Sequence, residues 1–179
     1  GVVGVGGVFT WARFSEAFLI LKATAEGLPL WLAPLVLVTM NLVYALGAYP
    51  AGVLSDRLNP RTLLLLGVAC LIIADLILAR STGLVGTFSG ICLWGAHMAL
   101  TQGLLAKLVA DAAPTRLRGS AFGVFSLVTG VSLLIASVGA GIIWDRFGAN
   151  MTFIAGAFFA AAAGIMLWLW RGSGERRLH

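Results

Sequence analysis

Charge is what this sequence has least of. Of its 179 residues only 11% are charged, whereas 60% are hydrophobic and the mean hydropathy is +0.99. Soluble domains typically carry about 25% charged residues. The composition therefore excludes an ordinary soluble domain and predicts a chain that is solvated mainly by lipid.

Cysteine and proline are also scarce, with 2 and 5 residues. Cys70 and Cys92 lie inside apolar segments without metal-ligand spacing, so we interpret them as buried free thiols and expect no metal and no cofactor. The basic run Arg176-Arg177 has no aromatic residues interleaved with it, so the net charge of +5 does not indicate a nucleic-acid partner. Glycine, in contrast, is abundant at 23 residues, as is typical of transmembrane helices.

Long apolar segments predict an all-α polytopic membrane protein with six transmembrane helices. A bilayer core of about 30 Å needs about 20 apolar residues per helix. We place the spans at roughly 2–24, 29–51, 62–80, 83–108, 119–143 and 150–171. The first span is the least apolar, because Arg13, Ser15 and Glu16 interrupt it. The short links predict antiparallel neighbours.

A short charged segment occurs twice in the chain. The first copy is Gly52-Val-Leu-Ser-Asp-Arg-Leu-Asn59 and the second is Gly141-Ile-Ile-Trp-Asp-Arg-Phe-Gly148. Three predicted spans separate the two copies. An odd number of spans places the copies on opposite sides of the membrane. This indicates one domain over residues 1–179, built of inverted repeats at about 1–80 and 83–171 and followed by a tail at 172–179. Inverted repeats are typical of secondary transporters.

The basic residues predict the orientation of the chain, because cytoplasmic loops carry an excess of Lys and Arg. Lys22, Arg80 and Arg146 belong to one side of the predicted topology. The larger group belongs to the other side: Arg57, Arg61, Lys107, Arg116, Arg118, Arg171, Arg176 and Arg177. We therefore expect a multi-pass protein of a bacterial inner membrane with its C-terminus in the cytoplasm.

The first Asp-Arg segment has the features of a conformational latch formed by Gly52, Asp56, Arg57 and Arg61. The carboxylate of Asp56 can face a neighbouring helix N-terminus or pair with an arginine, and such contacts break when helices rock apart. We expect Gly52 to allow a close helix crossing, Asn59 to suit a turn because it tolerates a left-handed backbone, and Pro60 to fit the first turn of the next helix. An ordinary positive-inside loop is the alternative interpretation.

Three segments resemble the major facilitator superfamily. The stretch Ala51-Gly-Val-Leu-Ser-Asp-Arg-Leu-Asn-Pro-Arg61 resembles the signature loop of that family, although Asn59 and Pro60 replace a usual glycine and a usual basic residue. Arg118-Gly-Ser-Ala-Phe-Gly123 is similar to the entry of the eleventh helix, and Phe14-Ser-Glu-Ala-Phe-Leu19 to a seventh helix.

The chain therefore resembles the C-terminal half of such a transporter, helices seven to twelve. The resemblance implies a small-molecule substrate, transport by alternating access and a central cavity completed by an N-terminal six-helix half. The sequence begins at Gly1 rather than Met, so we interpret it as part of a longer polypeptide.

Polar side chains inside the spans predict where a cavity lies, because such residues are costly in lipid and usually functional. Arg13 and Glu16 share one helix face, where they either contact a substrate or proton or neutralise each other. His97 titrates near neutral pH in an unperturbed setting and is a candidate for proton coupling, with a packing role as the alternative. The candidate cavity residues are Arg13, Glu16, Asn41, Tyr44, Trp94, His97 and Gln102. For Asp75 we expect a structural pairing with Arg80.

Two functions from other classes compete with transport. An intramembrane serine protease needs a nucleophile and a histidine on neighbouring helices, but Ser89 and His97 lie on one predicted helix, so we expect no enzyme. A stand-alone six-helix module that works as a dimer, with a second copy in place of the missing half, remains an alternative. The mixture of aromatic and polar candidates favours efflux of amphipathic compounds over sugar uptake.

Overall fold

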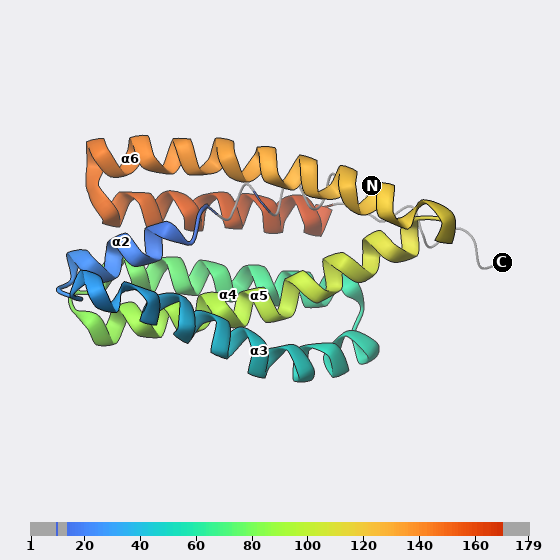
Figure 1. The fold of residues 1–179 in the computed structure, drawn as a ribbon, viewed down its shortest axis with the longest axis horizontal. Coiled ribbons are helices and arrows are strands. Elements are labelled where there is room, and N and C mark those ends of the chain that lie inside the picture. Colours follow the sequence, from blue (N-terminus) through green and yellow to red (C-terminus); the bar gives the residue numbers. More distant parts are fainter. Residues whose placement is uncertain (1–9, 11–13, 170–179) are drawn as a thin grey trace.

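The computed structural model describes Thr10 and residues 14–169, and these residues form helices and no strand (Figure 1). The elements in chain order are α2 (Ala17–Ala25), the 3-10 turn η1 (Leu30–Leu32), α3 (Ala33–Arg57), α4 (Pro60–Arg80), α5 (Leu84–Ala112), the 3-10 turn η2 (Thr115–Leu117) and α6 (Arg118–Leu169). The predicted all-α class is confirmed.

Helix α6 consists of two helical arms joined at Gly148. The backbone of Gly148 has φ 82° and ψ 177°, a conformation that residues with a Cβ rarely adopt. The first arm (residues 118–147) and the second arm (residues 149–169) therefore turn back on each other, as the orange and red ribbons show (Figure 1). They correspond to the fifth and sixth predicted spans. Among the described residues, four helices are long and apolar enough to cross a membrane, the last including both arms.

The first predicted span is broken where its polar residues occur. Thr10 is helical, Phe14 and Ser15 are not, and α2 begins only at Ala17. The backbone N–H of Ser15 donates instead to Ser137 Oγ of the first arm, at 3.1 Å. Most of the other residues of this span, including Arg13, lie outside the described part of the chain.

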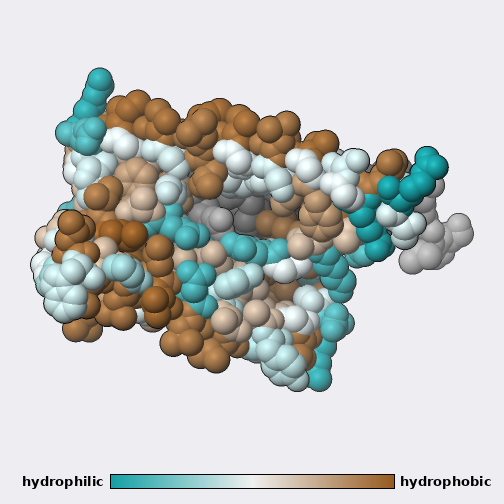
Figure 2. Space-filling model, viewed as in Figure 1, coloured by the Kyte–Doolittle hydropathy of each residue, from teal (hydrophilic) through white to brown (hydrophobic). Residues whose placement is uncertain are grey.

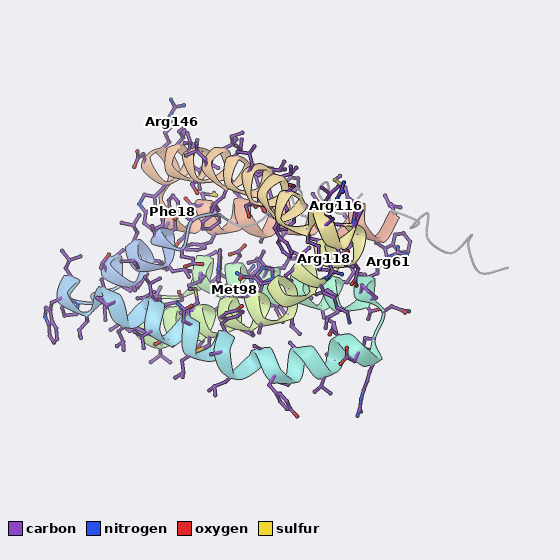
Figure 3. The ribbon with its side chains drawn as sticks, turned by 45° about the vertical axis from the view of Figure 1, so that its right-hand side comes forward. Phe18, Arg61, Met98, Arg116, Arg118 and Arg146 are labelled. Atoms are coloured by element: carbon purple, nitrogen blue, oxygen red, sulfur yellow. The ribbon has the colours of Figure 1, made fainter. Side chains whose placement is uncertain are left out.

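The links between helices gather at the two ends of the bundle. The α3–α4 link and η2 lie at one end, and the α2–α3 link, the α4–α5 link and Gly148 lie at the other (Figure 1). Arg61, Arg116 and Arg118 lie toward the first end and Arg146 toward the opposite end (Figure 3). This division matches the two groups of basic residues in the sequence, while the assignment of the first end to the cytoplasm stays a prediction.

Helix α5 lies at the centre of the bundle, because it packs against both α3 and α4, and α4 in turn packs against α6. A glycine at each contact lets the helices approach. A Cβ at Gly95 of α5 would lie 2.5 Å from the carbonyl oxygen of Met40 on α3, and one at Gly90 would lie 2.6 Å from Leu78 Cγ on α4. Small residues at helix contacts are a common device in membranes, where apolar burial drives little association.

The outer faces of α3 and of the first arm remain apolar and exposed. On α3, Leu46 is 70% exposed, and on the first arm Leu127 is 67% exposed. The outer side of the first arm forms a continuous hydrophobic surface, with hydrophilic residues near the two ends of the molecule (Figure 2). These faces are suited to contact with lipid or with further transmembrane helices.

A partly buried ion pair and its hydrogen bonds to the backbone connect the end of α2 to the link between α4 and α5. Lys22 Nζ lies 2.6 Å from Glu26 Oε1 and donates to the carbonyl oxygen of Ser81 at 3.1 Å, and the Gly83 N–H donates to Glu26 Oε2 at 2.6 Å. Both hydrogen bonds lower the pKa of the Glu26 carboxyl group, and the one from Lys22 has the larger effect. This contact fixes the end of α2 against the rest of the bundle.

Candidate functional site

A cavity of about 240 Å³ lies between α5 and the first arm of α6. Its wall is formed by Thr10, His97, Thr101, Gln102, Leu105, Ala106, Phe125 and Thr129. Polar side chains thus face a space bordered by aliphatic and aromatic ones, as is usual for small-molecule sites. Among the described residues, this lining contains no acid, lysine or arginine, and its titratable group is His97.

The side chain of His97 is positioned by backbone contacts between α4 and α5. It is 1% exposed, and its Nδ1 lies 2.8 Å from the carbonyl oxygen of Gly67. A carbonyl oxygen only accepts hydrogen bonds, so in the neutral imidazole the hydrogen lies on Nδ1. One turn later, Thr101 Oγ1 donates to the carbonyl oxygen of His97 at 2.8 Å. The histidine and threonine therefore form one wall of the cavity.

Gly67 makes this arrangement possible, and the sequence did not indicate its role. A Cβ at Gly67 would overlap Thr101 Cγ2 and would lie 3.7 Å from His97 Nδ1. On the opposite wall, Thr129 Oγ1 donates to the carbonyl oxygen of Phe125 at 2.8 Å. The threonines were likewise missed, although their positions four residues after His97 and Phe125 place each on the same helix face as that residue.

Of the predicted cavity residues that the structure describes, two lie together in this lining, His97 and Gln102. Trp94 is completely buried in the core, and its Nε1 has no hydrogen-bond partner among the described residues. Asn41 is exposed on α3 and donates to the carbonyl oxygen of Leu37 at 2.8 Å, while Tyr44 is half-buried on the same helix.

Neither Asn41 nor Tyr44 lines this cavity. Glu16 is half-buried immediately before α2, and Arg13 lies outside the described residues. Among the residues that the structure describes, no group of three His, Cys, Asp or Glu is placed to hold a metal ion.

The Asp-Arg segment belongs to a helix rather than to a loop. Asp56 and Arg57 are in the last turn of α3, and the carboxylate of Asp56 pairs with Lys107 of α5, with Oδ1 and Nζ 3.4 Å apart. Arg61 is exposed in the first turn of α4. The pair is largely exposed, at 75% for Asp56 and 50% for Lys107. We had not expected Lys107 as the partner of Asp56.

One detail of the predicted latch is wrong. A Cβ at Gly52 would meet nothing within 4 Å, so Gly52 does not mark a close helix crossing in the described structure. Asn59 has φ −59° and ψ 137°, an extended conformation, and Pro60 begins α4 directly after it, as expected for a proline in the first turn of a helix. The latch itself stays a prediction.

Comparison with known proteins decides the family. Residues 6–178 match the family model described as Major Facilitator Superfamily. This chain belongs to the Major Facilitator Superfamily. An uncharacterised MFS-type transporter of Methanocaldococcus jannaschii is 28% identical over 169 residues, covering 91% of this chain and 42% of the relative. The crystal structure of the POT family transporter PepTSo superposes with a TM-score of 0.72 at 16% identity, covering 94% of this chain and 36% of that chain.

The family match and the MFS-type relative support a membrane transporter of this type, and the described residues include helices long and apolar enough to cross a membrane. The chain spans less than half the length of the two proteins it was compared with. The likeness to PepTSo shows the fold alone, because so low an identity carries no information about the substrate.

Proposed function

We propose that this chain is one half of a secondary active transporter that moves a small solute by alternating access. The observation that supports it is the cavity between α5 and the first arm, where His97, Gln102 and Thr129 present polar groups at membrane depth. Polar groups within spans are costly in lipid and are usually kept for a pathway.

Proton-coupled efflux is the form of transport we propose. His97 borders the cavity, and its Nδ1 is hydrogen-bonded to the carbonyl oxygen of Gly67. A proton gained or lost by His97 therefore changes the charge at the wall of the cavity. We further propose that the pair Asp56–Lys107 acts as the latch. It joins the ends of α3 and α5 through two exposed side chains, which separate at little cost when the helices move.

A second six-helix unit is needed to enclose the solute pathway, and we propose that it is an N-terminal half of the same polypeptide. The exposed apolar faces of α3 and of the first arm offer it a surface, and the relatives are more than twice as long as this chain. A second copy of this chain is the alternative occupant. We place the assembly in the cell membrane, with the end that carries Arg61 and Arg118 in the cytoplasm.

Solute flux into proteoliposomes containing the full-length protein tests this proposal. A responsive solute is one that the parent protein transports in this assay. We expect Gln102→Ala and Thr129→Val to change the flux of such a solute, because both remove polar groups from the cavity. Ser89→Ala is a matched control, since Ser89 is exposed on α5 and bonds only to the carbonyl oxygen of Val85 among described groups. If the cavity variants transport as well as the control for every responsive solute, the pathway does not pass through this cavity.

A further inference from the structure

Asp75 is a buried carboxyl group at membrane depth that the proposed pathway does not use. It lies in α4 with 0% exposure, and neither of its side-chain oxygens has a hydrogen-bond partner among the described residues. The pairing with Arg80 expected from the sequence is therefore not formed, and Arg80 is exposed at the end of the helix. An ionised carboxylate without a partner in such a place is far more costly than a neutral carboxyl group.

The carboxyl group of Asp75 lies against Gly156 of the second arm of α6, and the ring of Phe14 approaches the same residue. A Cβ at Gly156 would be 2.8 Å from Asp75 Oδ2 and 2.7 Å from Phe14 Cε1. Only a glycine on the second arm leaves room for both groups. The carboxyl group and the ring therefore border the same point of the second arm.

Trp94 contains a buried hydrogen-bond donor that, like the acceptor oxygens of Asp75, has no partner among the described residues. Its indole Nε1 donor is buried without a hydrogen-bond partner in the described structure, and its ring packs on Phe14 with centroids 5.5 Å apart. Phe14 thus borders an unsatisfied donor and an unsatisfied acceptor. A buried polar group left unsatisfied calls for an explanation, because each omission costs about 1–3 kcal/mol.

The position of Phe14 depends on the break in the first span. Phe14 precedes α2 in a segment without helical structure, and its ring is held by contacts with Phe18 at 5.2 Å and Phe153 at 5.5 Å. Movement of this segment would remove the ring from its place beside Asp75 and Trp94.

No described ionisable group neutralises Asp75 in this structure. The second arm contains no ionisable side chain. Lys22 is bonded to Glu26 and the carbonyl oxygen of Ser81, and His97 Nδ1 to the carbonyl oxygen of Gly67. The ionisable groups on or beside α2, α4 and α5 include Glu16, Lys22, Cys70, Arg80, Cys92 and His97.

We propose that Asp75 is a proton-binding site whose occupancy is controlled by Phe14. With Phe14 in place, Asp75 holds its proton and is uncharged. When the Phe14 segment withdraws, water enters, the carboxyl O–H bond breaks and the proton passes to water. The indole N–H of Trp94 then donates to the carboxylate oxygen and stabilises the negative charge. The coupling of this step to transport rests on the proposed alternating access, whereas the protonation of Asp75 does not.

Infrared spectroscopy of the full-length protein in lipid tests the site without any transport measurement. At neutral pH we expect a band of a protonated carboxyl group that Asp75→Asn removes and that the exposed control Asp145→Asn leaves in place. Absence of such a band in the parent protein at neutral pH would overturn the proposal. A failure of transport alone leaves this band unchanged, so the two proposals fail separately.

The role of Trp94 and Phe14 is tested by titrating the same band. Trp94→Phe should raise the pH at which the band disappears by about one unit, which corresponds to about 1.4 kcal/mol, because the donor to the carboxylate is lost. Trp144→Phe is the control and should not shift it. Phe14→Leu should lower that pH, since a smaller side chain admits water. A band that titrates identically in the parent, Trp94→Phe and Phe14→Leu would refute control by these side chains.

Discussion

Replacement of Gly95 by alanine tests the packing that positions the cavity. Gly95 faces α3 at the centre of α5, two residues before His97. A Cβ there would lie 2.5 Å from the carbonyl oxygen of Met40 and 3.1 Å from Val43 Cβ. A backbone carbonyl cannot rotate away as a flexible side chain can, so α3 and α5 must separate by several tenths of an ångström.

The expected magnitude follows from two opposing effects. Overpacking of a well-packed contact costs about 1–3 kcal/mol, and alanine recovers up to about 1 kcal/mol relative to glycine through its helix propensity. With the full recovery, the free energy of unfolding should fall by up to about 2 kcal/mol in Gly95→Ala. Gly103→Ala is the matched control, because it lies on the same helix and a Cβ there meets nothing within 4 Å. It should be neutral or slightly stabilising.

The assay is unfolding of the purified protein in mild detergent by increasing SDS, followed by circular dichroism and tryptophan fluorescence. The reasoning predicts an earlier midpoint for Gly95→Ala and an unchanged or later one for Gly103→Ala. Equal midpoints for the two variants would refute the close contact of α3 with α5.

Three further predictions concern the charged and titratable groups. Asp56→Asn should slow solute flux in the full-length protein while changing the free energy of unfolding by less than about 1 kcal/mol, as measured by SDS titration, because the Lys107 pair is exposed. His97→Gln should alter the pH dependence of flux in proteoliposomes, and a profile identical to that of the parent would exclude His97 from coupling. The lowered pKa of Glu26 stabilises the fold above the ordinary value of 4.5, and this stabilisation should be lost as the pH falls below 4.5 and through the folded-state pKa. Thermal unfolding of Glu26→Gln should lack this acid-dependent loss.

The helices could be predicted because each contains an apolar segment long enough to be recognised in the sequence. The span at 62–80 lies within α4, the span at 83–108 lies within α5 except for Gly83, and the chain reverses at Gly148, the last residue of the second Asp-Arg segment. The end of α3 was less accurate, since the sequence placed the charged segment after the span whereas the helix continues through Arg57. Charged side chains are tolerated at a helix end that reaches the membrane surface, so hydropathy alone does not mark where the helix stops.

The candidate site was predictable only in part, because its residues come from helices that are far apart in sequence. His97 and Gln102 were found because a polar residue inside a span is conspicuous. Thr129 was not found, because a threonine in a span normally donates its hydroxyl hydrogen bond to a backbone carbonyl of the same helix, as Thr129 does, and so gives no sign of a functional role. Gly67 was missed for another reason: its role depends on how α4 crosses α5, which no local pattern reveals.

Accessibility of the cavity from each side of the membrane tests the central claim most directly. Gln102→Cys, introduced into full-length protein whose Cys70 and Cys92 are replaced by alanine, should react with a membrane-impermeant maleimide. Its labelling from the two sides should change in opposite directions when a transported solute is added. Ile165→Cys on the exposed apolar face of the second arm should not react. Failure of Gln102→Cys to react from either side, or labelling that a transported solute leaves unchanged, would contradict a solute pathway through this cavity.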